Sequence, residues 1–170
     1  MAPCAPCTVA DKVDLLLMVD NSRGLADKQL LLALAIPDLV RGLLNPLCVD
    51  AQGQPGAMQP AGPLELCSAG TTGAFPPVMD LHIGVIDSSL GGHGSDSCST
   101  SETQGCGASG NPSNNDSGRL LSRVDACGGQ NLPTYDNKGF LAWDPGQKLM
   151  PAGDKTVSYT HLTLPTNREV

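Results

Sequence analysis

The sequence predicts an α/β fold in which a helix connects two neighbouring parallel strands. Three segments predict it: an apolar run at residues 13–19, a helical pattern from Ala26 to Leu44, and a second apolar run at 81–86. The five consecutive apolar residues 15–19 are typical of a strand that is covered on both faces, as in parallel sheets. A strand, a helix and a strand in this order form the right-handed crossover unit, so we expect the two strands to pair in parallel.

Length and charge restrict the class of protein. The chain has 170 residues and a formal net charge of -7, which suits one acidic domain. This balance argues against a nucleic-acid partner, because phosphates require clustered Lys and Arg. The longest apolar runs are much shorter than the roughly 20 residues of a membrane helix, so we expect no transmembrane segment.

The expected helix at 26–44 carries a broad apolar stripe. Residues at three- and four-residue steps define one face: Leu32, Ile36, Leu39 and Leu43. Further apolar residues widen this stripe, so the helix should be well buried: Leu30, Leu31, Leu34 and Val40. Pro37 cannot donate a backbone hydrogen bond, so we expect it to kink or break the helix.

Cysteines indicate an oxidising compartment. Seven cysteines in a chain rich in Gly, Pro and Ser favour disulfides over the alternative of reduced cytosolic thiols. The candidates for disulfides are Cys48, Cys67, Cys98, Cys106 and Cys127. Cys48 and Cys67 could close the long Pro/Gly-rich segment 45–79, although the spacing leaves other pairings open. Cys4 and Cys7 have CxxC spacing, but no second ligand pair completes a zinc site.

The second half of the chain offers a short strand and several acidic loops. Residues 139–143 are expected to form an edge strand, followed by a turn at 144–146. In the Gly/Ser/Asn-rich segment 91–139, Asp96, Asp116 and Asp125 lack the pattern of a calcium loop. We interpret them as solvated loop acids.

The sequence gives little support for metal binding by His82 or for catalysis by Ser22. His82 alternates with apolar residues in the second strand, and no other metal ligands lie at suitable spacing. We interpret it as a histidine on a partly covered strand face. Acyl transfer by Ser22 would need a Gly-x-Ser-x-Gly turn, which the sequence lacks there.

Asp20 and Ser22 form the candidate site, because they directly follow the first strand. Ligands of open α/β sheets bind just beyond the carboxyl ends of the strands. The second strand ends in the same way, at Asp87, Ser88 and Ser89. An alternative is that Asp20 caps the following helix, with its side chain accepting from backbone N–H groups.

This strand and turn resemble the von Willebrand factor A (VWA) domain. In that family an apolar strand ends in the metal-ion-dependent adhesion motif (MIDAS) Asp-x-Ser-x-Ser, and the match here is Asp20-x-Ser22-x-Gly24. The wider pattern is similar to secreted, cysteine-rich bacterial members, over 14–31, 80–98, 115–123 and 139–145.

The resemblance implies a fold and a domain organisation. The fold would be a Rossmann-like parallel sheet with flanking helices and long disulfide-bearing loops. Residues 1–12 would be a Cys/Pro-rich lead-in, and 13–156 the N-terminal part of an incomplete VWA domain with insertions at 45–79 and 91–139. No signal sequence is visible at the start of the chain, so a secreted protein would have its true N-terminus upstream.

The resemblance also implies a cation site. Mg²⁺, or alternatively Ca²⁺ or Mn²⁺, prefers oxygen ligands, and Asp20 and Ser22 would supply a carboxylate and a hydroxyl. An open position on the metal would accept a carboxylate of a protein partner. Gly24 replaces a motif serine, and the family's later Thr and Asp ligands are expected beyond residue 156. Ser88 and Ser89 could offer substitute oxygens.

Residues 157–170 are expected not to belong to the protein. Residues 157–166 closely resemble one reading frame of a transposase adapter used in short-read DNA library preparation. We therefore expect an adapter-derived sequencing artefact and leave this tail out of the fold, as one would a fusion scar. The alternative is a genuine β-rich tail.

The expected function is that of a metal-ion-dependent protein-binding or adhesion module rather than an enzyme. It would belong to a secreted or surface-attached bacterial protein, such as an adhesin or lipoprotein, in an extracellular, periplasmic or outer-membrane location. The alternative is a structural, disulfide-stapled surface domain with a non-functional metal site, which Gly24 favours. A phosphatase with Asp20 as nucleophile would need a second Asp where Ser22 stands.

Overall fold

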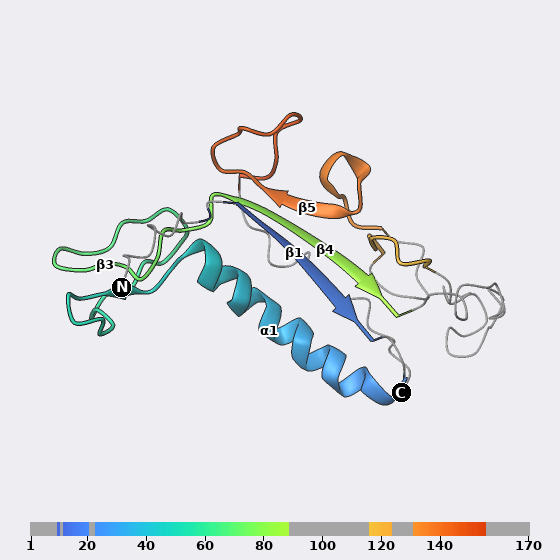
Figure 1. The fold of residues 1–170 in the computed structure, drawn as a ribbon, viewed down its shortest axis with the longest axis horizontal. Helices are drawn as coiled ribbons and strands as arrows, with labels where there is room; N and C mark the ends of the chain where they lie inside the picture. Colours follow the sequence, from blue (N-terminus) through green and yellow to red (C-terminus); the bar gives the residue numbers. More distant parts are fainter. Residues whose placement is uncertain (1–9, 11, 21–22, 89–115, 124–130, 156–170) are drawn as a thin grey trace, which may run out of the picture.

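The molecule is built on a three-stranded sheet with one long helix packed against it (Figure 1). The computed structural model describes residues 10, 12–20, 23–88, 116–123 and 131–155. Its elements are β1 (Lys12–Val19), η1 (Arg23–Leu25), α1 (Ala26–Leu44), β2 (Cys48–Val49), β3 (Thr72–Gly73), β4 (Asp80–Asp87), η3 (Tyr135–Asn137) and β5 (Phe140–Trp143). Several residues singled out in the sequence lie outside the described residues: Cys4, Cys7, Ser22, Ser89, Asp96, Cys98, Cys106, Asp125, Cys127 and the tail at 157–170.

The sheet has the strand order β1-β4-β5. β1 and β4 pair in parallel along their whole length, from Lys12↔Asp80 to Val19↔Asp87, as the sequence predicted. β5 pairs with the first half of β4 in the antiparallel direction, so the sheet is mixed rather than purely parallel. The prediction of an α/β fold is therefore confirmed at the level of a mixed sheet with a helix, and β5 is the expected edge strand.

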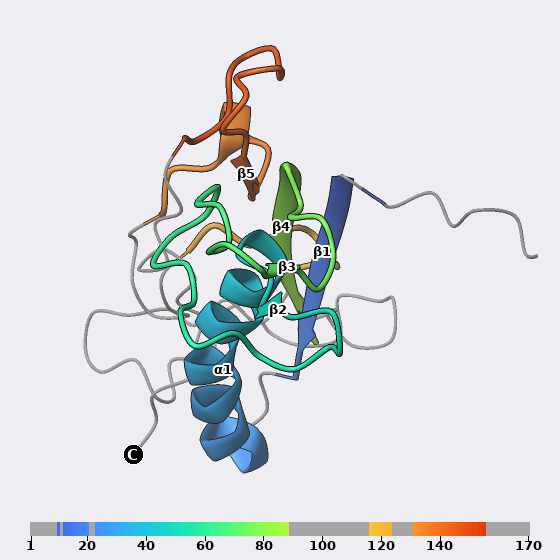
Figure 2. The same cartoon turned by 90° about the vertical axis from the view of Figure 1, so that its left-hand side faces the viewer.

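α1 covers one face of this sheet and runs antiparallel to β1 and β4, as Figures 1 and 2 show. Its buried side chains Ile36, Val40 and Leu44 pack against a core that includes Val19, Leu81, Ile83 and Trp143. The buried stripe is narrower than expected. Four leucines of α1 are exposed, because they lie away from the sheet: Leu30, Leu31, Leu34 and Leu39.

Pro37 does not break α1, which was one of the two effects that the sequence led us to expect of it. The helix continues through it to Leu44. Ile36 and Val40, on either side of Pro37, are fully buried against the sheet. Their burial stabilises the helical path by several kcal/mol in total, at roughly 1.5–3 kcal/mol for each side chain, which offsets the hydrogen bond that proline cannot make.

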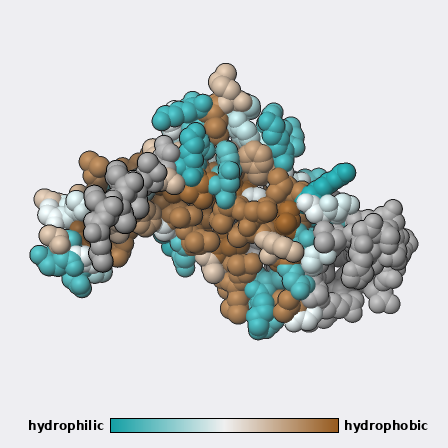
Figure 3. Space-filling view, viewed as in Figure 1, coloured by the Kyte–Doolittle hydropathy of each residue, from teal (hydrophilic) through white to brown (hydrophobic). Residues whose placement is uncertain are grey.

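β1 is covered on one face only, so the expectation of a strand buried on both faces is wrong. Its residues alternate between exposed and partly buried positions, and Leu16 and Met18 are 58% and 67% exposed. The physical reason is that α1 packs on only one side of the sheet. Apolar side chains reach the surface across the middle of the molecule in Figure 3, where Figure 1 draws the sheet and α1.

The segment 45–79 is held together by a disulfide and a small antiparallel ladder. Cys48 and Cys67 form the disulfide that the sequence suggested, with 5.7 Å between their Cα atoms. β2 pairs with β3 through Cys48↔Gly73 and Val49↔Thr72. The side chain of Gln59 bonds both backbone groups of Cys48, accepting from its N–H at 2.8 Å and donating to its carbonyl at 3.0 Å. Among the described residues, no helix is long and apolar enough to cross a membrane.

Candidate functional site

Asp20 and Ser88 lie side by side at the carboxyl edge of the sheet. β1 and β4 are parallel and in register, so the residues that follow them emerge together. The N–H of Ser88 donates to the carbonyl of Val19 at 3.1 Å. Its hydroxyl donates to Oδ1 of Asp20 at 3.4 Å. Both side chains are exposed, so two oxygen-bearing groups from different strands face solvent at one point.

Gln29 fixes the turn after β1 from the side of the helix. It lies in the first part of α1 and is buried. Its Nε2 donates to the backbone carbonyl of Asp20 at 2.6 Å. The Oε1 atom of the same amide is buried and has no hydrogen-bond partner among the described residues. Sequence reasoning missed Gln29, although a polar residue at helical spacing from Ala33 and Ile36 is a signal that could have found it.

The start of α1 tests the alternative that Asp20 caps this helix. Leu25 occupies the N-cap position of this helix, and no side-chain hydrogen bond caps it there. α1 therefore gives no support to Asp20 as its cap. The turn between β1 and α1 is instead bridged by η1, which contains Gly24.

Asp87 is engaged in a buried ion pair beside this edge. The carboxylate is 1% exposed, and its Oδ2 lies 3.1 Å from Nη2 of Arg123. Arg123 also holds Asp116, with Nη2 donating to Oδ2 at 2.7 Å and Nη1 pairing with Oδ1. Asp116 is thus not the solvated loop acid that we expected, since its side chain is only 8% exposed and is paired with a cation.

Neighbouring charges and burial shift the pKa of Arg123 in opposite directions. Burial is the largest single influence and lowers the pKa of its guanidinium. The hydrogen bonds and negative charges of Asp116 and Asp87 together outweigh burial, so the pKa is raised. Arg123 therefore stays a cation that neutralises Asp87 and joins the segment 116–123 to the end of β4. Sequence reasoning missed this residue as well.

His82 lies on the sheet, about 20 Å along the strands from Asp20 at about 3.3 Å per residue. Its Nδ1 lies 2.8 Å from Oδ1 of Asp14, and its ring centre is 5.1 Å from that of Phe140. The ring is partly covered, as the sequence interpretation expected. The two ring nitrogens face different carboxylates, since Nε2 lies 3.4 Å from Asp80.

The residues at the carboxyl edge fit a divalent cation in part. Asp20 offers a charged oxygen and Ser88 a neutral one, which is the donor chemistry of a hard cation. In the part of the chain that the structure describes, no group of three or more His, Cys, Asp or Glu residues could hold a metal ion. Gly24 contributes no side-chain oxygen, but a Cβ added there would meet no atom within 4 Å, so a serine would fit.

Comparisons with known proteins give no information about the function of the site. The chain matches no protein-family model, no curated protein and no solved structure.

Proposed function

We propose that this chain is the N-terminal part of a von Willebrand factor A-type domain that acts as a metal-ion-dependent protein-binding module. The observation that carries the proposal is the meeting of Asp20 and Ser88 at the carboxyl edge of parallel strands. In open α/β sheets this edge is where ligands bind. The finer fold of the proposal is a Rossmann-like sheet, of which β1, α1 and β4 would be the first crossover.

Mg²⁺ is the proposed cation, with Ca²⁺ or Mn²⁺ as alternatives. Asp20 would provide its charged ligand, and Ser88 and Ser22 would provide neutral oxygens. When bound, the cation would supply a positive centre that accepts a carboxylate from a partner protein. Such a site binds and does not catalyse. Few protein ligands predict weak affinity, on the order of the 10⁻³ M at which extracellular modules bind Ca²⁺.

Neighbouring residues support a role for Asp20 in particular. Asp87 is buried against Arg123, so its charge is already balanced inside the protein. Asp20 is an exposed carboxylate at this edge, and Gln29 holds its backbone carbonyl from α1. The proposed location is extracellular, periplasmic or at the outer membrane, which the Cys48–Cys67 disulfide favours.

The second candidate is a structural surface domain whose metal site no longer works. Gly24 favours this second candidate, because a glycine in place of the last serine of the motif removes one side-chain oxygen. The two candidates differ in one measurable respect. Only a working site raises the thermal midpoint as the concentration of Mg²⁺ increases, by mass action.

Isothermal titration of the full chain with MgCl₂ tests the proposal. We expect saturable binding that Asp20→Asn abolishes. The matched control is Asp38→Asn, which removes an exposed carboxylate from α1. We also expect Gly24→Ser to tighten binding by about tenfold, since affinity follows the number of oxygen ligands.

Two results would contradict the metal site. One is equal binding of Mg²⁺ by the Asp20→Asn variant and the unsubstituted chain. The other is an unchanged thermal midpoint in Mg²⁺ for both the unsubstituted chain and Gly24→Ser, which is the result that the structural candidate predicts.

A further inference from the structure

A concave surface lies at the other end of the sheet from Asp20. It is lined by the last residue of α1 and by residues of the disulfide-closed segment 45–79. The cavity has a volume of about 520 Å³. That volume is in the range of roughly 300–1,000 Å³ that is usual for ligand sites. We call it the loop pocket.

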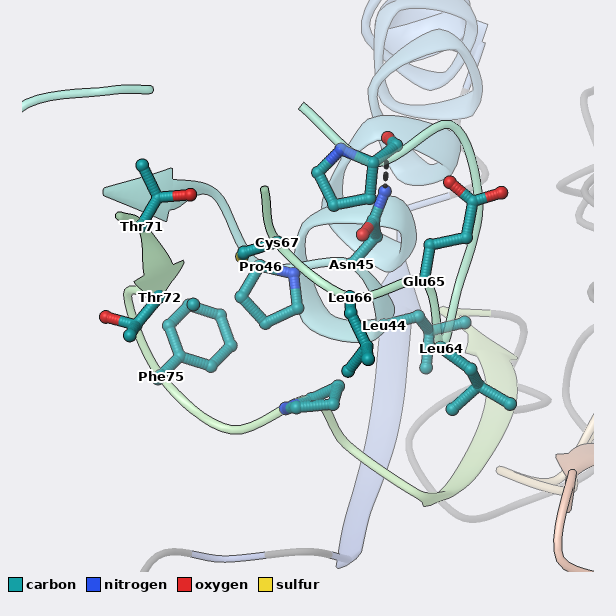
Figure 4. Close-up of a pocket in the computed structure, with 13 residues that line it drawn as sticks. Leu44, Asn45, Pro46, Leu64, Glu65, Leu66, Cys67, Thr71, Thr72 and Phe75 are labelled. Carbon is teal, nitrogen blue, oxygen red and sulfur yellow. Dashed lines mark hydrogen bonds between the residues drawn. The ribbon is translucent and has the colours of Figure 1, made fainter. Parts of the chain in front are cut away.

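Exposed apolar side chains surround the loop pocket. Leu64, Leu66 and Phe75 line it together with Pro46 and Leu44, as Figure 4 shows. Leu66 is 93% exposed, and Leu64 and Phe75 are also exposed. Large apolar side chains that gather around a hollow in water favour burial by a partner.

The polar groups of the loop pocket are largely engaged within the protein. Asn45 donates from Nδ2 to the carbonyl of Pro60 at 3.0 Å (Figure 4). Thr71 donates from its hydroxyl to the carbonyl of Ser68 at 2.8 Å. The pocket therefore presents apolar side chains to a ligand, with the carboxylate of Glu65 beside them.

The walls of the pocket are fixed before any ligand arrives. The Cys48–Cys67 disulfide and the β2–β3 ladder hold the two sides of the segment together. Leu64 is held at a φ of 70°, in the left-handed region that leucine rarely adopts. Preorganised walls of this kind reduce the ordering that a ligand must impose on binding.

The charged residues of the segment 45–79 favour one kind of partner for the loop pocket. The segment 45–79 contains no Lys, Arg or His, and its two charged residues are Asp50 and Glu65. Glu65 lines the loop pocket, where its Oε2 accepts from the N–H of Ala61 at 2.8 Å. Glu65 is the one charged residue among the described residues that line the pocket, and a carboxylate at this position favours basic side chains of a partner over acidic ones.

We propose that the loop pocket docks an extended segment of a partner protein in which apolar side chains alternate with basic ones. The apolar side chains would enter the cavity between Leu64, Leu66 and Phe75. The basic side chains would remain at the rim, near Glu65. This interaction is separate from the cation site, because the two surfaces lie at opposite ends of the strands.

The probe is a fluorescein-labelled seven-residue peptide of alternating lysine and leucine, and the readout is fluorescence anisotropy. We expect saturable binding to the full chain that Leu66→Ser and Phe75→Ser each weaken by about tenfold or more, since each removes a buried apolar contact. Glu65→Gln should weaken binding and reduce its dependence on salt. EDTA and Asp20→Asn should leave the affinity unchanged, which separates this proposal from the cation site.

The control variant is Met58→Ser. Met58 is exposed in the same segment but does not line the pocket, so its substitution should not change the affinity. If Phe75→Ser fails to fold, Leu66→Ser alone tests the role of the apolar side chains. Leu66 is almost fully exposed, so its substitution should not affect folding.

Three outcomes would overturn the proposal. The first is equal affinity of the peptide for Leu66→Ser and the unsubstituted chain. The second is equal binding of a matched peptide with glutamate in place of lysine. The third is self-association of the chain in sedimentation that Leu66→Ser abolishes, which would assign the loop pocket to a second copy of this chain.

Discussion

Arg123 joins two carboxylates that belong to different parts of the chain. It lies between Asp87, at the end of β4, and Asp116, and the side chains of all three residues are largely buried. Breaking a buried pair by removing one partner leaves an uncompensated charge, which is far more destabilising than losing an exposed pair. Arg123 is therefore expected to have a large effect on stability.

Arg123→Met should lower the free energy of unfolding by about 3 kcal/mol, because Asp87 would stay buried without its cation. Urea denaturation followed by circular dichroism measures the change. The matched control is Arg41→Met, which breaks an exposed pair with Asp38 on α1 and should cost about 0–1 kcal/mol. Equal losses for the two variants would contradict the role of Arg123.

Asp144 is a buried carboxylate in the turn after β5. It accepts from the backbone N–H groups of Lys148 and Leu149, both at 2.9 Å. Burial is the largest single influence and raises its pKa, but the backbone hydrogen bonds from Leu149, Lys148 and Gly153 together outweigh it. The pKa of Asp144 is therefore lowered below its usual value of 3.8.

A lowered pKa gives Asp144 a defined effect on acid stability. The carboxylate contributes stability that is fully present above pH 3.8 and is lost as the pH falls through its lower pKa in the folded state. Asp144→Asn should lower the thermal midpoint at pH 7 and make the loss of stability in acid less steep. Thermal melts of both chains from pH 7 down to about pH 2 test this, with Asp38→Asn as the exposed control. An acid profile of Asp144→Asn parallel to that of the unsubstituted chain would exclude the effect.

The candidate site shows which residues can be predicted from a sequence. Asp20 and Ser88 could be placed because each lies within two residues of the end of an apolar run, and parallel pairing brings the ends of such runs together. Gln29 and Arg123 could not, because their roles depend on contacts made only after folding. Arg123 lies 36 positions from Asp87, with no local pattern linking the two.

At the scale of elements, the apolar patterns located β1, α1, β4 and β5 well. Their periods are local properties, so the sequence carries them directly. The same patterns predicted more burial than the structure has, since Leu16 and Leu34 are exposed. A run of leucines does not reveal how many faces of a helix or strand will be covered. Pro37 does not break α1 for a related reason, since packing outweighs a local helix-breaking tendency.

The disulfide is the element-scale feature with the largest expected effect. Cys48 and Cys67 are separated by 19 positions, and closing a loop of this size should contribute about 3 kcal/mol to stability. The double variant Cys48→Ala and Cys67→Ala should therefore unfold at a lower urea concentration. Leu66→Ala, an exposed substitution in the same segment, is the control and should be nearly neutral. A double variant as stable as the unsubstituted chain would contradict the expectation.

At the scale of the whole molecule, the two proposed surfaces occupy opposite ends of one layer of strands. Asp20 and Ser88 lie where β1 and β4 end, and the loop pocket lies where α1 ends. α1 spans the distance between them, and its inward-facing residues from Leu32 to Leu44 pack in the core with the sheet (Figure 1). One protein could therefore hold a cation-dependent partner and a basic partner at the same time, without competition for space.

The parallel pairing of β1 and β4 has a consequence for how fast the chain folds. Every pair in this ladder joins residues 68 positions apart, so the ladder cannot form until a long crossover has closed. Contacts between such distant residues slow folding, because chain entropy is lost before the contacts form. The Cys48–Cys67 bond lies inside this crossover and shortens the path along the chain between the two strands. Chains in which this disulfide forms early should therefore complete the sheet sooner than chains in which it is still reduced, although each doubling of loop length changes the cost of closure by only about 0.6 kcal/mol.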